Sequence, residues 1–131
     1  MYKAHTPDTL RAPFGNYSHA IEVPAGARLL VCSGRLGVSL ADEIPADVEA
    51  QARQCFDNIG AILKSADMGF ENLIRINAYV TDRRYFAEYM KVRDQYVSSP
   101  PPASTLMVVS GFTHPECLVE IEALAARTEN N

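Results

Sequence analysis

Glutamates alternate with apolar residues in Leu118-Val119-Glu120-Ile121-Glu122-Ala123-Leu124-Ala125, which predicts a β-strand over about residues 117–126. Successive side chains of a strand leave opposite faces, so positions 118, 120, 122 and 124 share one face and positions 119, 121, 123 and 125 share the other. Both faces then carry apolar side chains, and both need cover. A partner subunit is the simplest cover for a face that helices leave open.

Four other segments are predicted to be strands. Ser18–Val23 alternates, Arg28–Ser33 is a short apolar run typical of a strand, and the turn Pro24-Ala25-Gly26 between them predicts a hairpin. Another strand is expected over about 103–109, directly after three prolines. The fourth segment, Leu73–Val80, alternates strongly. Its two predicted faces are Ile74, Ile76, Ala78 and Val80 on one side, and Arg75, Asn77 and Tyr79 on the other.

Two amphipathic helices are predicted between these strands. Asp47 can cap the first, which we expect to end near Met68-Gly69 with glycine in the left-handed conformation. Thr81-Asp82 can cap the second, which Pro100-Pro101-Pro102 stops. Apolar spacings of three and four support both helices: Val48, Ala52, Cys55, Ile59, Ile62 and Leu63 in the first, and Phe86, Tyr89, Met90, Arg93 and Val97 along one side of the second.

This order of elements predicts an α+β sandwich, in which one mixed sheet is covered on one face by two helices. The 131 residues fit a single domain, 1–131, with no repeat or linker. A net charge of −4 gives no field that would attract nucleic acid, so we expect no nucleic-acid partner. No stretch is apolar enough to cross a membrane, and a secretory leader is lacking, so we expect a cytoplasmic protein without membrane contact.

The cysteines and histidines do not form a metal-binding pattern. Cys32, Cys55 and Cys117 are odd in number and far apart, and we expect them to be reduced thiols packed in the core. Three isolated histidines make no ligand set, so we expect no metal and no cofactor. His19 and His114 are interpreted as strand and loop residues, because no carboxylate partner is identifiable for either.

Four segments together resemble the RidA (YjgF/YER057c/UK114) family of enamine/imine deaminases. Their order and spacing hold from about Ala12 to Ala125, and they are Gly15-Asn16-Tyr17-Ser18, Ser33-Gly34-Arg35, Pro100–Val109 and Leu118–Ala125. The resemblance implies a chorismate-mutase-like sandwich, a homotrimer whose sheets line a central barrel, and small-molecule clefts between subunits. It also implies a 2-iminobutanoate/2-iminopropanoate deaminase-like hydrolase acting on C=N bonds.

The resemblance assigns roles to several residues of this chain. Glu120 would lie in the cleft and orient or deprotonate the attacking water. Tyr17 would contact the ligand, and the alternative is an aromatic residue that only packs at the start of a strand. Ser33 and Gly34 would offer backbone that the ligand can approach closely, and the alternative is an ordinary bulge at the end of a strand. The alternative for Glu120 and Glu122 is a structural ion pair with Arg53, Arg75 or Arg35 across the interface, which we favour for Glu122 but leave open for Glu120.

Three positions depart from the pattern of catalytic members. Ser104, or Thr105 after a one-residue slip, stands where the family has the arginine that holds a substrate carboxylate. Met90 replaces a polar asparagine, and Arg35 replaces a glutamine. Arg35 is a candidate to replace the lost charge in the cleft, and Arg93 is a weaker one.

Two functions from different classes follow. The first is a RidA-like deaminase or hydrolase of a small reactive metabolite, whose substrate differs from aminoacrylate-type imino acids because the arginine is missing. The second is a trimeric small-molecule-binding or regulatory protein without catalysis, which Ser104 and Met90 favour. A ribonuclease is disfavoured, because the chain is acidic and has no catalytic histidine pair.

Overall fold

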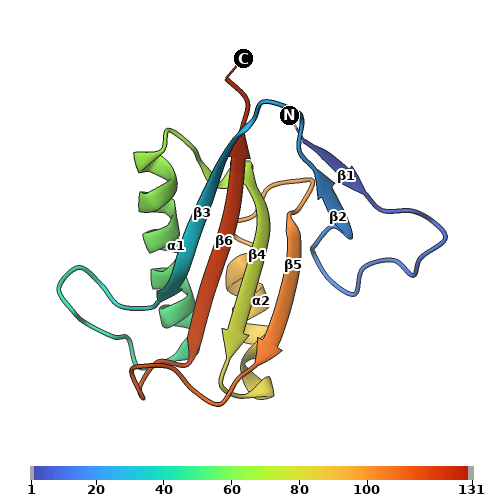
Figure 1. Cartoon of the computed structure of the whole chain (residues 1–131). Helices are drawn as coiled ribbons and strands as arrows, with labels where there is room; N and C mark the ends of the chain where they lie inside the picture. Colours follow the sequence, from blue (N-terminus) through green and yellow to red (C-terminus); the bar gives the residue numbers. More distant parts are fainter. Residues whose placement is uncertain (1, 130–131) are drawn as a thin grey trace.

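A four-stranded mixed sheet carries two helices on one face and leaves the other face open (Figure 1). The computed structural model describes residues 2–129. The strand order is β3-β6-β4-β5, and a separate two-stranded ribbon pairs β1 with β2. The α+β prediction is confirmed.

The strands are β1 (Lys3–His5), β2 (Ala20–Glu22), β3 (Arg28–Leu36), β4 (Leu73–Val80), β5 (Ala103–Val108) and β6 (Val119–Arg127). The helices are α1 (Val48–Ser65) and α2 (Phe86–Arg93), each next to a short 3₁₀ turn, η1 (Phe70–Asn72) and η2 (Arg83–Tyr85).

Strand β6 lies in the middle of the sheet and decides what each face carries. It runs antiparallel to β3 and β4, whereas β4 and β5 are parallel. The predicted alternation is confirmed, because Val119, Ile121, Ala123 and Ala125 are buried against the helices while Glu120, Glu122 and Leu124 are partly exposed on the open face. Leu29, Val31 and Met107 are exposed large apolar side chains of the sheet.

The predicted hairpin between residues 18–23 and 28–33 is wrong. Strand β2 pairs with β1, with His5 opposite Ala20, and β3 pairs with β6 along most of its length. A tight turn does form, with Gly26 at a φ of 84°. The nine-residue β3 gains more backbone hydrogen bonds from the equally long β6 than the three-residue β2 could offer. Nearness in sequence therefore predicted the wrong partner.

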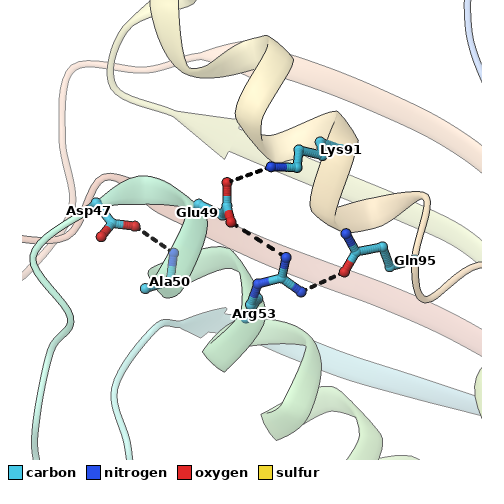
Figure 2. Close-up of polar contacts among 6 residues, drawn as sticks. All are labelled: Asp47, Glu49, Ala50, Arg53, Lys91 and Gln95. Carbon is cyan, nitrogen blue, oxygen red and sulfur yellow. Dashed lines mark hydrogen bonds and ion pairs between the residues drawn. The ribbon is translucent and has the colours of Figure 1, made fainter.

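The first helix begins as predicted. The Asp47 side chain accepts a hydrogen bond from the Ala50 amide at 2.8 Å (Figure 2). Figure 2 also shows two polar contacts that join α1 to the end of α2, since Glu49 pairs with Lys91 at 3.3 Å and Arg53 donates to Gln95. These contacts fix α2 relative to α1, and α2 forms one wall of the pocket described below.

Both helices end earlier than predicted. Helix α1 stops at Ser65, and Asp67 rather than Gly69 takes the left-handed conformation, with a φ of 58°. Gly69 is extended instead. Helix α2 stops at Arg93, before the three prolines. Three residues after the helix end, the Tyr96 ring stacks on Phe56, with 4.8 Å between the ring centroids.

Strand β4 differs from strict alternation at its first residues. The register shifts between Leu73 and Arg75, so Leu73 is buried whereas Ile74 is only partly buried. The predicted core face is therefore wrong at Ile74 and correct from Ile76 onward. Beyond this bulge, Arg75, Asn77 and Tyr79 share the open face with the glutamates of β6.

All three cysteines are buried and unpaired, as predicted. Burial is the main cause that raises the pKa of each thiol, and it raises the pKa of Cys55 to about 12. A thiol with such a pKa stays protonated near neutral pH, so Cys55 is a poor nucleophile. Among the described residues, no helix has the length and apolar character needed to cross a membrane.

Candidate functional site

Glu120 lies on the open face of the sheet, beside Gly34 of the neighbouring strand. A bulge in β3 between Cys32 and Arg35 brings the Gly34 backbone under the Glu120 side chain. A Cβ atom built on Gly34 would lie 2.3 Å from Glu120 Oε2, so only glycine leaves room for the carboxylate there. Within residues 2–129, the Glu120 carboxylate makes no hydrogen bond or ion pair, and it is free to bind something from outside the chain.

Adding a methyl group at Gly34 is expected to move the Glu120 carboxylate. Because the clash is with the far end of a flexible side chain, Gly34→Ala should unfold at nearly the wild-type temperature. Under the prediction that Glu120 acts on the attacking water, we expect turnover to fall about 10- to 100-fold, because a misplaced catalytic group is costly. The measurement is the rate of ammonia release, with the melting temperature as a check. Gly111→Ala is the matched control, because a Cβ there meets nothing within 4 Å. Full activity of Gly34→Ala would contradict the placement of Glu120 in the site.

Glu122, two residues along the same face, is held by side chains of β4. It accepts hydrogen bonds from Asn77 Nδ2 at 3.1 Å and from the Tyr79 hydroxyl at 2.6 Å. The bond to Glu122 is the main cause that raises the pKa of Tyr79. Within one chain, the partners of Glu122 are thus an amide and a phenol, and an ion pair of Glu122 with an arginine across the interface stays a prediction. The alternation of β4 predicts that Asn77 and Tyr79 share this face, but it does not predict their hydrogen bonds to Glu122.

Within the described chain, none of the three candidate arginines pairs with Glu120 or Glu122. Arg75 donates to Thr105 Oγ1 at 2.7 Å. Arg53 lies on α1, where it pairs with Glu49. Because of the bulge, Arg35 lies opposite Ile121, on the helix side of the sheet, and its buried Nε has no partner among residues 2–129. An ion pair of Glu120 with a second copy of the chain stays a prediction.

A second group of predicted residues gathers at the other edge of the sheet. A pocket of about 490 Å³ lies between β5, α2 and the segment before β2. Tyr17, Met90 and Ser104 all line it, and so does Arg93. Its other lining residues are Phe14, Gly15, Phe86 and Leu106. The pocket therefore has mostly apolar walls, with one guanidinium and two hydroxyl groups.

Backbone pairing decides which of Ser104 and Thr105 faces this pocket. Ser104 lies opposite the buried Ile76 and points to the helix side, where the pocket is. Thr105 lies opposite Asn77 and points to the open face, where it meets Arg75. Of the two candidate positions, Ser104 is the one that lines the pocket.

The segment that carries Tyr17 is fixed to the proline-rich start of β5. Ser18 donates from its hydroxyl to the Pro101 carbonyl at 2.5 Å and from its amide to the Pro102 carbonyl at 3.1 Å. The Tyr17 hydroxyl accepts from the Phe14 amide at 3.2 Å, and the Tyr17 ring meets His19 edge to face. These bonds of Ser18 position Tyr17 in the pocket wall. The sequence motif contained Ser18 but did not indicate this role.

The two groups of predicted residues do not meet within one chain. Ser33, Gly34 and Glu120 lie on β3 and β6, with the carboxylate on the open face, whereas the pocket lies on the helix side of β5. Strand β4 separates β6 from β5, and β3 and β5 are opposite edges of the sheet. A site that uses both groups must combine them from two copies of the chain.

A family model described as Endoribonuclease L-PSP matches residues 8–127, nearly the whole chain. The chain belongs to the RidA (YjgF/YER057c/UK114) family. A RidA relative from Bos taurus, named 2-iminobutanoate/2-iminopropanoate deaminase, is 34% identical over 123 residues, which are 91% of this chain and 87% of that protein.

Solved RidA structures share the fold over almost the full length. The Rid family protein YyfB from Yersinia pestis has a TM-score of 0.84 at 24% identity, covering 96% of this chain and 98% of that one. RidA from the Antarctic bacterium Psychrobacter sp. PAMC 21119 has a TM-score of 0.73 at 29% identity, covering 95% and 99%. The predicted RidA fold is therefore confirmed, while the roles of individual site residues stay predictions.

Proposed function

We propose that this RidA protein is an imine deaminase whose water-activating group is Glu120. The observation that carries the proposal is a carboxylate with no hydrogen bond or ion pair within residues 2–129, held over Gly34 on the open face. An unpaired carboxylate that is partly buried is costly unless it is used. Relatives named as 2-iminobutanoate/2-iminopropanoate deaminases support this class of reaction.

The proposed reaction is hydrolysis of a C=N bond. Glu120 takes a proton from water as the oxygen bonds to the imine carbon, and it returns that proton to the nitrogen to give a carbinolamine. Glu120 then takes the proton of the carbinolamine hydroxyl as the carbonyl forms, and it returns this proton to the nitrogen as the C–N bond breaks and ammonia leaves. An enamine enters the same route after tautomerising to the imine. These steps need an oriented water and one acid/base group, and they call for no cofactor.

We further propose that the site forms between subunits of a homotrimer. Glu120 and Gly34 of one protomer would face the pocket of Tyr17, Met90 and Ser104 of the next, because the two groups lie on different faces of one chain. Association would also cover the exposed Leu29 and Val31. Light scattering on the purified protein tests this, and a monomer would leave the site incomplete. A cytoplasmic location remains our expectation.

The second candidate is a trimeric protein that binds a small molecule without turning it over. Met90 and Ser104 favour it, because both line the pocket and neither holds a carboxylate by two parallel hydrogen bonds. In this case the pocket of about 490 Å³ would bind a ligand, and Glu120 would have no chemical step to perform.

Ammonia release from freshly generated imines separates the two candidates. The panel should span imino acids with small, branched and aromatic side chains, together with neutral imines. We expect acceleration over the uncatalysed rate for at least one apolar member. If no member is accelerated although ligands bind, the protein is a binding protein and the deaminase proposal is wrong.

A further inference from the structure

Arg93 is a buried cation in the wall of the pocket. It is the last residue of α2, where a positive charge is favoured by the helix dipole, and it is only 4% exposed. Its guanidinium lies close to Gly15, in the loop before β2. A Cβ atom built on Gly15 would be 3.8 Å from Arg93 Nη2. It also lies near the Tyr89 ring, with the guanidinium carbon 5.9 Å from the ring centroid. The charge therefore lies in the wall of the pocket that Ser104 also lines, not on the outer surface of the helix.

The partner of Arg93 leaves part of the guanidinium available. Both Nε and Nη2 donate to the same oxygen of Asp94, Oδ1, at 3.1 and 3.0 Å. No residue in the range 2–129 accepts a hydrogen bond from Nη1. Asp94 itself is nearly half exposed, so water weakens its hold on Arg93. A buried arginine with an unused donor can bind an anion that enters the pocket.

The remaining pocket walls indicate what the rest of the ligand is like. Phe86, Met90 and Leu106 present apolar surface, and Phe14 stands exposed at the rim. Ser104 and Tyr17 add hydroxyl groups. A ligand that satisfies this pocket carries one anionic group and an apolar body larger than a methyl group.

We propose that Arg93 is the carboxylate anchor of this pocket, and that the pocket takes imino acids whose carboxylate meets Arg93 and whose branched or aromatic side chain packs on Phe86, Met90 and Leu106. The inference rests on the proposed deaminase function and names its substrate class. In the family pattern the anchoring arginine lies on β5, at the position that Ser104 occupies here. In this proposal the anchoring charge lies at the end of α2 instead. Arg35, the other candidate, lies on β3, at the opposite edge of the sheet from Ser104 on β5.

Titration calorimetry with two stable probes tests the anchor. The probes are 4-methyl-2-oxopentanoate, the product of a branched imino acid, and its neutral methyl ester. A charge-assisted hydrogen bond predicts that Arg93→Met weakens binding of the carboxylate about 10- to 100-fold, with less than about a twofold change for the ester. Arg84→Met is the matched control, because Arg84 is an exposed arginine just before α2 and lines no part of the pocket. The control should bind both probes like the wild type.

A second variant avoids the risk that Arg93→Met perturbs folding. Asp94→Asn removes the carboxylate that competes for Arg93, at an exposed position. We expect it to tighten binding of 4-methyl-2-oxopentanoate about two- to fivefold, within the range of an exposed ion pair. Pyruvate, which lacks the branched side chain, should bind the wild type about tenfold or more weakly than 4-methyl-2-oxopentanoate.

Several results would overturn the inference. One is an affinity for the carboxylate probe that stays unchanged in both Arg93→Met and Asp94→Asn, and another is an equal loss of affinity for the acid and the ester in Arg93→Met. A wild type that binds neither probe would also overturn it. So would a loss of carboxylate affinity in Arg35→Met and not in Arg93→Met. Ammonia release is measured separately. If binding depends on Arg93 but no ammonia is released, the deaminase function is wrong and Arg93 is still the carboxylate anchor. If ammonia is released and the rate does not depend on Arg93, the deaminase function is supported and the anchor is wrong.

Discussion

Glu120→Gln is expected to lower the rate of ammonia release about 10²- to 10⁴-fold, the range for loss of a general acid/base. The amide has the shape of the carboxylate but cannot accept the proton from water. Because Glu120 makes no hydrogen bond or ion pair within residues 2–129, the substitution should barely change the melting temperature or the oligomeric state. The measurement is turnover of the best imine of the panel at saturating concentration, with light scattering on the same sample.

Glu122→Gln is the matched control for Glu120. It lies on the same strand and face, and the glutamine oxygen can still accept from Tyr79 and Asn77. We expect less than about a tenfold loss of turnover, because a structural hydrogen bond is retained. Full activity of Glu120→Gln, or equal losses in the two variants, would contradict the assignment of water activation to Glu120.

Gln51→Leu is expected to have the largest effect on stability of any single polar substitution in α1. Gln51 is fully buried, and its amide donates to the carbonyls of Pro45 at 2.9 Å and Glu116 at 3.0 Å. Its oxygen accepts from the Leu118 amide at 2.7 Å. Leucine would leave all three backbone groups without this partner, at a cost of about 1–3 kcal/mol for each one that stays buried and unpaired. We expect the free energy of unfolding to fall by about 3 kcal/mol or more.

Thermal and urea unfolding measure this loss, and about 3 kcal/mol corresponds to a fall in melting temperature of roughly 10 °C. Gln54→Leu is the control on the same helix, because within residues 2–129 the Gln54 side chain bonds only to the Asn58 side chain, one turn further along α1. It should change stability by no more than about 0.5 kcal/mol. Gln51 binds the amide of Leu118, which lies two residues before Glu120. The loss of Gln51 should therefore also lower turnover. Equal melting temperatures for the two variants would show that the Gln51 network contributes little.

Local patterns in the sequence were sufficient for most elements. The alternation in β6 correctly separated buried Val119 and Ile121 from Glu120 and Glu122 on the open face. Asp47 was correctly identified as the cap of α1. These features depend on side-chain spacing and on hydrogen bonds between near neighbours, so a short stretch of sequence contains the information needed to predict them.

The candidate site was only partly predictable, because it depends on a bulge and on distant strands. Strict alternation through β3 would place Arg35 on the same face as Val31, towards Glu120. The bulge moves Arg35 to the helix side and puts Gly34 beside Glu120 instead. Likewise, the pairing of β5 with β4, not the sequence motif, places Ser104 rather than Thr105 in the pocket beside Arg93.

Local sequence patterns and motifs were enough to predict the RidA fold, the two faces of β6 and a carboxylate on its open face at residue 120. Contacts between distant segments were needed to show that β2 pairs with β1, that Arg35 faces the helices and that Arg93 lines the pocket. The physical reason is that alternation is a property of neighbouring residues, whereas strand partners and bulges are chosen so that backbone groups far apart in the chain are hydrogen-bonded together.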